Sequence, residues 1–161
     1  MQLSADLFIE PLAPLNKQQK LLCSGIKKHV QMLAGDIGAR SLTSAPKGLE
    51  DAANYIEHVL QQIGFSFTRQ EFKAEVYNTN ARQQMPATIH TTRNIIAELK
   101  GSKRPNEILI IGAHYDTEYL SRGANDNASG IAALLEIAKA MRNSDKSERT
   151  IRFVAFSNEE Q

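Results

Sequence analysis

A histidine and several carboxylates follow the two most hydrophobic runs of the chain. The run EILII is followed by the segment GAHYDTEYLSRGANDN, which carries His114, Asp116 and Asp126. The run TIRFVAF is followed by Glu159 and Glu160. An imidazole and several carboxylates at close range repel one another unless protons or a cation neutralise them. A metal ion is the simplest remedy, so these residue types predict a metal site.

The donor types favour particular metals and divide the work among the side chains. Nitrogen and carboxylate ligands without cysteine suit catalytic zinc, with Mn²⁺ or Co²⁺ as substitutes. His114 and Asp116 are two residues apart at a strand end, so Asp116 can accept a hydrogen bond from the imidazole nitrogen that faces away from the metal. Glu159 and Glu160 are adjacent and cannot point identically. One of them can therefore bind metal while the other acts as a general base towards water.

These side chains can meet only if the elements that carry them converge. Residues 107–113 are predicted to form a strand, residues 131–141 a helix and residues 150–156 a second strand, which together make a βαβ unit. The crossover makes the two strands parallel, so that their carboxyl ends share one edge of the sheet. Ligands bind at that edge in such sheets. We therefore expect His114, Asp116, Asp126, Glu159 and Glu160 to lie together.

The rest of the chain predicts a three-layer α/β sandwich around a mixed, centrally parallel sheet. Amphipathic helices are expected over 17–33 and 49–63, early strands over 65–76 and 93–99, and a loop or irregular hairpin over 85–92. The continuous apolar run EILIIGA is typical of a strand buried on both faces, which implies helices on both sides of the sheet. The predicted core comprises Ile56, Leu60, Ile63, Ile95, Leu109, Ile110, Ile111, Leu134, Leu135, Phe153 and Val154.

Composition limits the other functions. The chain has 161 residues, 42% of them hydrophobic, which suffices for one globular domain. A formal net charge of +1 with interspersed signs argues against nucleic acid or an anionic membrane as partner. The first residues show no signal-peptide pattern, and no stretch has the length of a membrane span. We expect a soluble chain with an extended tail over about 1–15, and this pattern favours the cytoplasm.

Three motifs resemble one known family. GAHYDT, RGANDNASGIAALLE and TIRFVAFSNEE occur in the order and at the spacing of the co-catalytic zinc aminopeptidases related to aminopeptidase S, aminopeptidase Y and glutamate carboxypeptidase. The stretch LAGDIGARSLTSAPKGLEDAANYIEHVLQQIGF is similar to the helical entry of that family. The resemblance covers roughly residue 26 to the end of the chain.

The resemblance implies a role for each site residue. His114 would bind one zinc ion, Asp126 would bridge two, and Glu160 would bind the second. Glu159 would be the general base, and Asp116 would support His114. The family also has a cis peptide bond after the bridging aspartate.

The implied activity is that of a zinc metallopeptidase, most simply an aminopeptidase acting on a peptide or another substrate with a free N-terminal amine. The family uses two further ligands, an aspartate and a histidine, downstream of the glutamate pair. We therefore expect residues 1–161 to be the N-terminal portion of a single peptidase domain with little activity of its own. The sheet edge left exposed in such a portion would favour a homo-oligomer.

Two other functions remain open on this scaffold. A non-catalytic interaction domain can share the fold, although retention of all five site residues argues against it. A single-zinc glutaminyl cyclase type of acyltransferase is the second alternative, and cyclisation of N-terminal glutamine would distinguish it from release of amino acids.

Overall fold

The computed structural model describes residues 13–76, 88–144 and 147–160. Its helices are α1 (Lys17–Val30), which continues as a π-helical segment η1 (Gln31–Ile37), α2 (Pro46–Ile63) and α3 (Ser129–Arg142). Asn16 and Gln19 form a reciprocal capping box at the start of α1. None of the described helices is long and apolar enough to cross a bilayer.

The helix boundaries differ slightly from the predicted ones. The helical path of the first helix extends to Ile37 because the chain adds the π-helical segment rather than ending near residue 33. The second helix begins at Pro46, earlier than predicted, because proline is tolerated in the first helical turn. Gly64 ends it in the left-handed conformation with φ 91°. The expected tail over 1–15 lies outside the described residues up to position 12.

The described strands form one mixed sheet, as predicted. They are β1 (Phe67–Val76), β2 (Thr88–Leu99), β3 (Arg104–His114) and β4 (Arg149–Phe156), in the order β1-β2-β4-β3. β1 pairs antiparallel with β2, β2 pairs antiparallel with β4, and β3 pairs parallel with β4. The βαβ unit β3-α3-β4 is therefore confirmed, and the sheet agrees with the α/β class.

Two details of the predicted sheet are wrong. Residues 88–92, expected in a loop or irregular hairpin, belong to β2, because pairing with β1 carries that strand back to Thr88; residues 85–87 lie outside the described part. The parallel pair is not central in the described sheet, because β4 is flanked by β2 and β3 whereas β3 lies at the edge.

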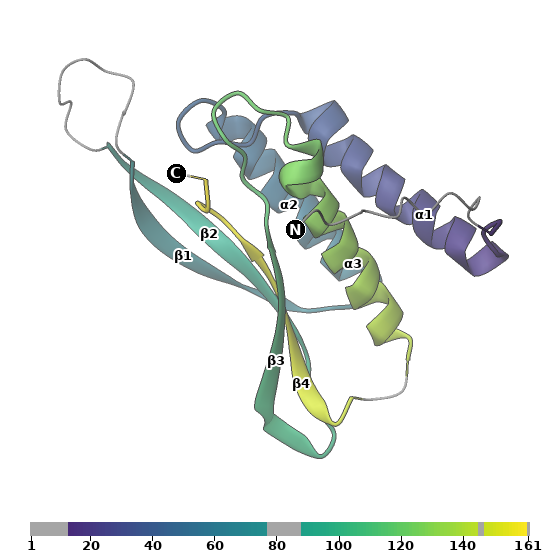
Figure 1. Cartoon of the computed structure of the whole chain (residues 1–161). Helices are drawn as coiled ribbons and strands as arrows, with labels where there is room; N and C mark the ends of the chain where they lie inside the picture. Colours follow the sequence, from purple (N-terminus) through teal and green to yellow (C-terminus); the bar gives the residue numbers. More distant parts are fainter. Residues whose placement is uncertain (1–12, 77–87, 145–146, 161) are drawn as a thin grey trace, which may run out of the picture.

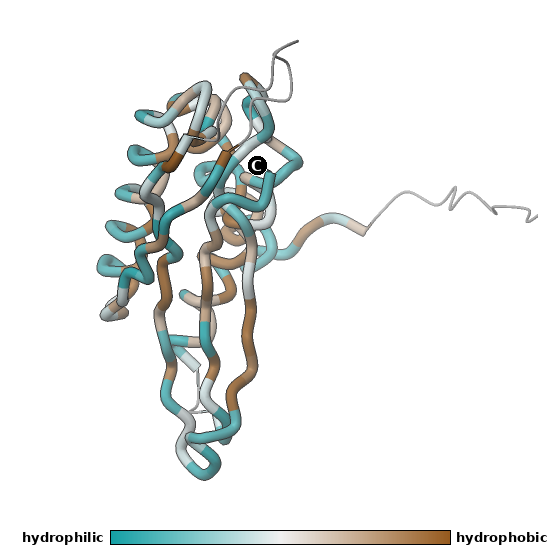
Figure 2. The backbone as a smooth tube through the Cα atoms, turned by 90° about the vertical axis from the view of Figure 1, so that its left-hand side faces the viewer, coloured by the Kyte–Doolittle hydropathy of each residue, from teal (hydrophilic) through white to brown (hydrophobic). Residues whose placement is uncertain are grey.

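Within the described residues, the helices cover one face of the sheet and not two (Figure 1). Leu109 and Ile110, predicted to be core, are 53% and 57% exposed. Ile110 pairs with Arg152 on the face that points away from the helices, whereas its neighbour Ile111 pairs with the buried Phe153. Hydrophobic stretches of the strands are visible in Figure 2, the view from the left-hand side of Figure 1. This continuous apolar run is therefore covered on one face only, and there only towards its end, because Leu109, which lies on the same face as Ile111, is 53% exposed.

The core lies between this one sheet face and the helices. Of the predicted core residues, Ile63 and Ile111 are partly buried and pack against it. The buried ones are Ile56, Leu60, Ile95, Leu134, Leu135, Phe153 and Val154. The periodicity of α2 and α3 was therefore sufficient to identify which helix positions face the sheet.

Candidate metal centre

The register of the parallel pair brings the predicted site residues to one end of the sheet. His114, the last residue of β3, pairs with Phe156, the last residue of β4. The hydrogen bond from Tyr115 N to Phe156 O, at 2.9 Å, extends this pairing by one step. Glu159 and Glu160 follow within a few residues. Two segments that are more than 40 positions apart in the numbering therefore meet because parallel strands end on the same side.

The imidazole of His114 lies at the centre of the group. Its Nε2 is 3.0 Å from Asp126 Oδ1 and 3.9 Å from Glu159 Oε2. His114, Asp126 and Glu160 each offer one ligand atom, and these atoms lie within 4.8 Å of one another. One imidazole nitrogen and two carboxylate oxygens at this spacing form a donor set that suits a divalent metal such as zinc. We call His114, Asp126, Glu159 and Glu160 the metal-edge cluster.

Asp126 reaches the cluster from a turn between β3 and α3. The turn η2 (Ala124–Ala128) contains non-helical backbone at Asp126 and Asn127, and the peptide bond between these two residues is cis, as expected. Asn127 Oδ1 accepts a hydrogen bond from Gly130 N at 3.0 Å, which satisfies a donor at the start of α3. The Asp126 side chain remains 70% exposed and points towards His114.

Asp116 is placed to orient His114. Its side chain is fully buried, and its Oδ2 accepts a hydrogen bond from Glu160 N at 3.0 Å. The other oxygen, Oδ1, lies 3.6 Å from His114 Nδ1, and neither atom has a hydrogen-bond partner. A buried imidazole nitrogen that faces a carboxylate, while the opposite nitrogen faces two more, is the arrangement of a metal-binding histidine with a supporting carboxylate. The side chains present therefore fit a bound metal.

The electrostatics of the cluster point the same way. Burial and the negative charge of Asp126 raise the pKa of Glu160, and His114 opposes this rise only in part. The ion pairs of Asp126 and Glu159 within the described residues are with His114, which is cationic only when protonated. A cation bound at the cluster would neutralise the negative charge of its carboxylates.

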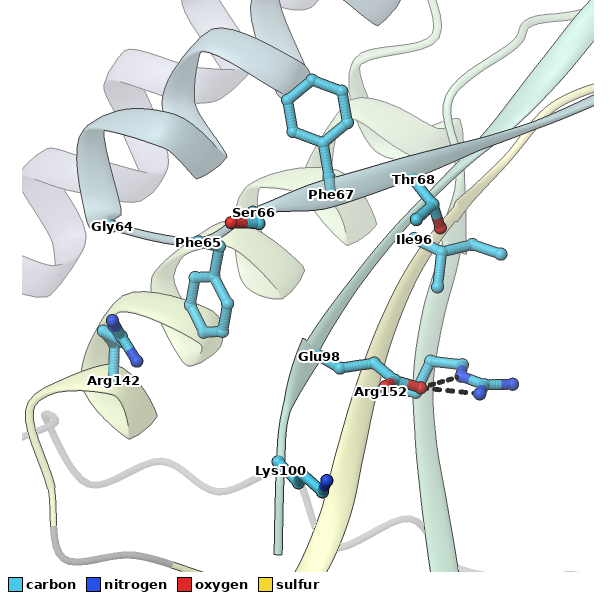
Figure 3. Close-up of a pocket in the computed structure, with 10 residues that line it drawn as sticks. All are labelled: Gly64, Phe65, Ser66, Phe67, Thr68, Ile96, Glu98, Lys100, Arg142 and Arg152. Carbon is cyan, nitrogen blue, oxygen red and sulfur yellow. Dashed lines mark hydrogen bonds and ion pairs between the residues drawn. The ribbon is translucent and has the colours of Figure 1, made fainter.

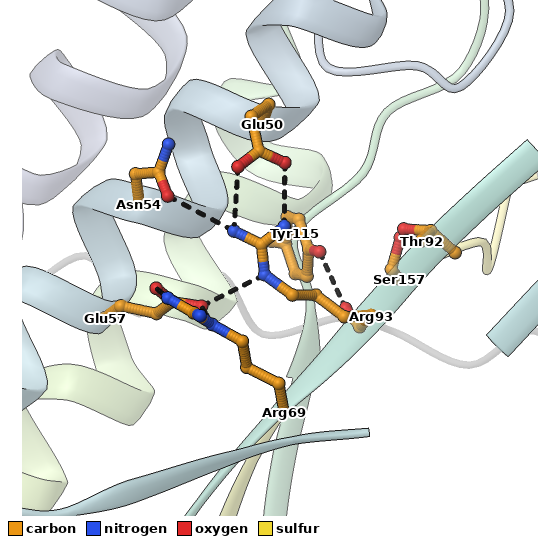
Figure 4. Close-up of polar contacts among 8 residues, drawn as sticks. All are labelled: Glu50, Asn54, Glu57, Arg69, Thr92, Arg93, Tyr115 and Ser157. Atoms are coloured by element: carbon orange, nitrogen blue, oxygen red, sulfur yellow. Dashed lines mark hydrogen bonds and ion pairs between the residues drawn. The ribbon is translucent and has the colours of Figure 1, made fainter. Parts of the chain in front are cut away.

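A second group of carboxylates lies between α2, β1 and β2 and has its own counter-charges (Figure 4). Glu57 accepts hydrogen bonds from Arg69 at 2.8 and 2.6 Å and from Arg93 at 3.0 Å. Arg93 also donates to both oxygens of Glu50, at 2.7 and 3.0 Å. We call these four residues the α2 ion-pair network. Every one of these contacts pairs a guanidinium with a carboxylate, so these carboxylates are neutralised without a metal ion.

A hollow of about 640 Å³ lies away from the metal-edge cluster. Figure 3 shows Phe65 beside Arg142, and the ion pair of Glu98 with Arg152 on the far side of the strands. The guanidinium of Arg142 lies 5.4 Å from the centre of the Phe65 ring. None of the residues that line this hollow belongs to the predicted site.

Sequence reasoning missed one buried residue beside the site. Arg40 is fully buried, and its backbone N donates to Thr117 Oγ1 at 2.9 Å while its carbonyl accepts from Thr117 N at 3.0 Å. Nothing in the spacing of Arg40 marks it, since its contacts with residues beside the site, such as Thr117, span more than 70 positions. A single arginine in the short segment GARS is the only local signal, and it is a weak one.

Comparison with known proteins confirms the resemblance at the level of the family. The model of peptidase family M28 matches residues 94–161. The chain is 44% identical over 75 residues to aminopeptidase YwaD of Bacillus subtilis, covering 45% of this chain and 16% of that protein. It is 31% identical over 130 residues to the "Probable lipoprotein aminopeptidase LpqL" of Mycobacterium tuberculosis, covering 81% and 23%. A "Probable zinc metalloprotease" of Pyricularia oryzae is 37% identical over 76 residues, covering 42% and 15%.

Solved structures share the fold. A zinc aminopeptidase from Bacillus subtilis superposes with a TM-score of 0.68 at 16% identity, covering 83% of this chain and 61% of that one. The glutaminyl cyclase of Fimbriiglobus ruber superposes with a TM-score of 0.67 at 27% identity, covering 94% and 48%. This chain therefore spans about half of the solved structures it matches, and less than a quarter of each of the three relatives named above.

Proposed function

We propose that this chain, whose residues 94–161 match peptidase family M28, supplies part of the active site of a zinc-dependent aminopeptidase. The observation that carries the proposal is the convergence of His114, Asp126 and Glu160, whose ligand atoms lie within 4.8 Å of one another at the end of the parallel strands. The unpartnered Nδ1 of His114 opposite the buried Asp116 supports it independently. A cluster that only stabilised the fold would pair its carboxylates with cationic side chains and would give His114 Nδ1 a hydrogen-bond partner.

In this proposal the site would hold two zinc ions. His114 and Asp126 would hold the first, and Asp126 and Glu160 the second. Asp116 Oδ1, which lies 3.6 Å from His114 Nδ1, would orient the ring through its negative charge, which would leave Nε2 for the metal. When bound, zinc acts as a Lewis acid and lowers the pKa of water. Mn²⁺ or Co²⁺ would serve as substitutes because they accept the same donors.

Glu159 is the proposed general base. Its carboxylate is 62% exposed and lies 3.9 Å from His114 Nε2, so it borders the ligand atoms and can still be reached by water and substrate. A carboxylate oxygen of Glu159 takes a proton from the attacking water and then gives it to the nitrogen of the leaving amine. The peptide bond breaks as the new carbon–oxygen bond forms, and Glu159 returns to its ionised state.

The substrate is proposed to be a peptide, or another compound, with a free N-terminal amine. Because the chain spans only part of its relatives, the resemblance implies that an aspartate and a histidine from a downstream region complete the ligand set. We also propose that the exposed edge strand β3 supports self-association, since an unpaired strand edge offers backbone donors and acceptors to a second copy.

Glutaminyl cyclisation is the second candidate reaction. The glutaminyl cyclase of Fimbriiglobus ruber matches 94% of this chain, more than the zinc aminopeptidase from Bacillus subtilis does. In that reaction the substrate's own amine would attack its γ-carboxamide and the amide nitrogen would leave as ammonia, with Glu159 moving the proton from the attacking to the leaving nitrogen. A test of function must therefore measure both products.

The test combines zinc binding with turnover. Calorimetry with Zn²⁺ is run on the 161-residue chain and on a version extended downstream, while release of nitroaniline from aminoacyl-nitroanilides and cyclisation of glutaminyl peptides are followed. Glu159→Gln is compared with Glu71→Gln, a matched change at an exposed position on β1. We expect the extended chain to bind two zinc ions and Glu159→Gln to lower kcat about 10²–10⁴-fold with zinc retained.

The outcomes separate the candidates. Amino-acid release that depends on Glu159 supports the aminopeptidase, whereas cyclisation with one bound zinc ion supports the cyclase. Absence of zinc binding in both chains would refute both reactions and leave an interaction domain on the same fold. Loss of activity in Glu71→Gln as well would show that the assay reports stability rather than chemistry.

A further inference from the structure

Arg40 lies between η1 and α2, and its fully buried guanidinium is surrounded by backbone oxygens. On its own side of the site, Nη1 donates to Gly38 O at 2.6 Å and to Leu33 O at 2.9 Å. These carbonyls belong to the end of the helical path that begins with α1. The helical layer therefore holds one side of the Arg40 guanidinium.

The other contacts of Arg40 grip the loop that joins β3 to α3. Nε donates to Tyr115 O at 2.8 Å, Nη1 to Arg122 O at 2.9 Å, and Nη2 to Gly123 O at 3.1 Å. Tyr115 directly follows the ligand His114, and Gly123 comes three residues before the ligand Asp126. A single planar group therefore holds both ends of the loop whose span sets the distance between these two ligands.

The contact with Gly123 extends into the turn that carries Asp126. Gly123 O accepts from Arg40 Nη2 and also from Ala128 N, at 3.0 Å. Gly123 has φ 51°, and a Cβ built there would lie 2.4 Å from Thr117 and 2.9 Å from Arg40 Nη2. Only glycine allows this close approach without movement of the guanidinium or the loop.

The chemistry explains why the residue is arginine. Burial lowers the pKa of Arg40 to about 10, and the negative charge of Asp116 opposes that change. A buried cation is costly unless it is hydrogen-bonded, and here backbone carbonyls and a buried carboxylate provide the compensation. The guanidinium presents donors in a rigid planar fork, whereas a lysine offers one nitrogen that cannot reach both loop ends.

We infer that Arg40 is a positioning residue of the proposed metal site, which clamps the two ends of the 115–123 loop and thereby sets the separation of His114 and Asp126. The inference rests on the proposed function for its consequence in metal binding. The clamp itself is a claim about the loop, and it can be tested in the absence of metal.

The first measurement is amide hydrogen exchange on the metal-free chain. Arg40→Lys keeps the charge and removes the fork, and Arg93→Lys makes the same change in the α2 ion-pair network. We expect the protection of the Thr117 and Ala128 amides to fall about tenfold or more relative to that of Leu135 in α3 when Arg40 is changed. In Arg93→Lys the ratio should be unchanged. A uniform loss of protection in Arg40→Lys would overturn the clamp.

The second measurement is titration with Co²⁺, followed by its visible absorption. We expect Arg40→Lys to bind Co²⁺ about tenfold more weakly or worse, with an altered spectrum, and Arg93→Lys to match the unchanged chain. Arg40→Lys with an unchanged affinity and spectrum would show that Arg40 does not set the ligand geometry. Destabilisation alone would weaken neither binding nor spectrum at temperatures where both variants are folded.

The two measurements fail independently of each other. If the unchanged chain binds no Co²⁺, the proposed metal function is wrong, and the exchange ratio still decides whether Arg40 clamps the loop. If Arg40→Lys does not fold, Thr117→Val takes its place, since it removes the acceptor of Arg40 N. Thr117→Ser keeps the hydroxyl and serves as its control. Thr117→Val with unchanged exchange and Co²⁺ affinity would overturn the inference.

Discussion

The metal-edge cluster and the α2 ion-pair network are built from the same kind of carboxylate and differ in their counter-charge. In the network, Glu57 is contacted by two guanidinium groups, and the hydrogen bonds from Arg69 and Arg93 outweigh burial and lower the pKa of Glu57. In the cluster, burial and neighbouring carboxylates raise the pKa of Glu160. The opposite directions of these two shifts agree with the proposal that the network stabilises the fold whereas the cluster binds a cation.

The comparison also shows what each region does for the protein. The network joins α2 to β1 and β2, so its charges hold the helical layer on the sheet (Figure 4). The cluster joins loop ends that the backbone already holds, and its carboxylates face one imidazole and no guanidinium within the described residues. We therefore expect the same carboxylate-to-amide change to have opposite consequences in the two regions.

The largest effect on stability is expected from Glu57→Gln. Glu57 is buried, and loss of its charge leaves Arg93 with a weakened partner, so the free energy of unfolding should fall by about 2–4 kcal/mol. Urea unfolding followed by circular dichroism measures this. Glu71→Gln, at an exposed site on β1, is the control and should change the free energy by less than about 0.5 kcal/mol. Equal effects in both variants would show that the α2 ion-pair network does not stabilise the fold.

Asp116→Asn tests whether the metal-edge cluster depends on the carboxylate behind His114. The amide keeps the shape of the buried side chain but removes the negative charge that faces His114 Nδ1 at 3.6 Å, so zinc affinity should fall about 10–100-fold. Calorimetry with Zn²⁺ tests this, and Asp51→Asn in α2 provides a change of the same type far from the cluster. An unchanged affinity in Asp116→Asn would mean that Asp116 does not support the ligand.

Acid should remove the stabilisation that Glu50 gives to the α2 ion-pair network. The hydrogen bonds from Arg93 lower the pKa of Glu50 from its usual 4.5, so the stabilisation from Glu50 is present above that pH and is lost as pH falls through the lowered value. The urea midpoint should therefore decline below about pH 4.5, and it should decline less in Glu50→Gln. A steeper decline in that variant would reverse the assigned sign.

The smallest effect is expected from Asp126→Asn in the absence of metal. Removing one negative charge from a cluster without a cation should leave the free energy of unfolding at pH 8 unchanged or raise it by up to about 0.5 kcal/mol. The same variant should lose the stabilisation that Zn²⁺ gives the unchanged chain. A loss of more than about 1 kcal/mol without metal would class Asp126 with Glu57, as a structural carboxylate.

Local patterns were sufficient for the elements and for the gathering of the site. Parallel strands end at one edge, so the sequence positions of His114 and Glu160 predicted their approach before any coordinates. The roles assigned to these residues stay predictions until metal binding is measured. This part of the structure was predictable because the order strand, helix, strand specifies a parallel pair without knowledge of its individual contacts.

Long-range contacts account for what the sequence did not reveal. The antiparallel pairing of β2 with β4 joins Ile95 to Ala155, and no local periodicity encodes such a partner. The exposure of Ile110 follows from the strand order, because β3 lies at the edge of the described sheet and its outward face has no helical cover there. Arg40 was missed for the same reason, since α2 and three strands separate it in the sequence from each of its loop partners.

The strand order β1-β2-β4-β3 also determines when, during translation, β3 can pair with its neighbouring strand. β4 is the last described strand to be translated, yet it lies between β2 and β3, so Ile111 cannot meet Phe153 until the ribosome has added more than 40 further residues. During that interval the nascent chain carries the apolar run of β3 without its neighbouring strand, which makes this segment a natural target for ribosome-associated chaperones. His114 and Asp126 are also translated before Glu159 and Glu160, so the metal-edge cluster can form only after β4 has been synthesised.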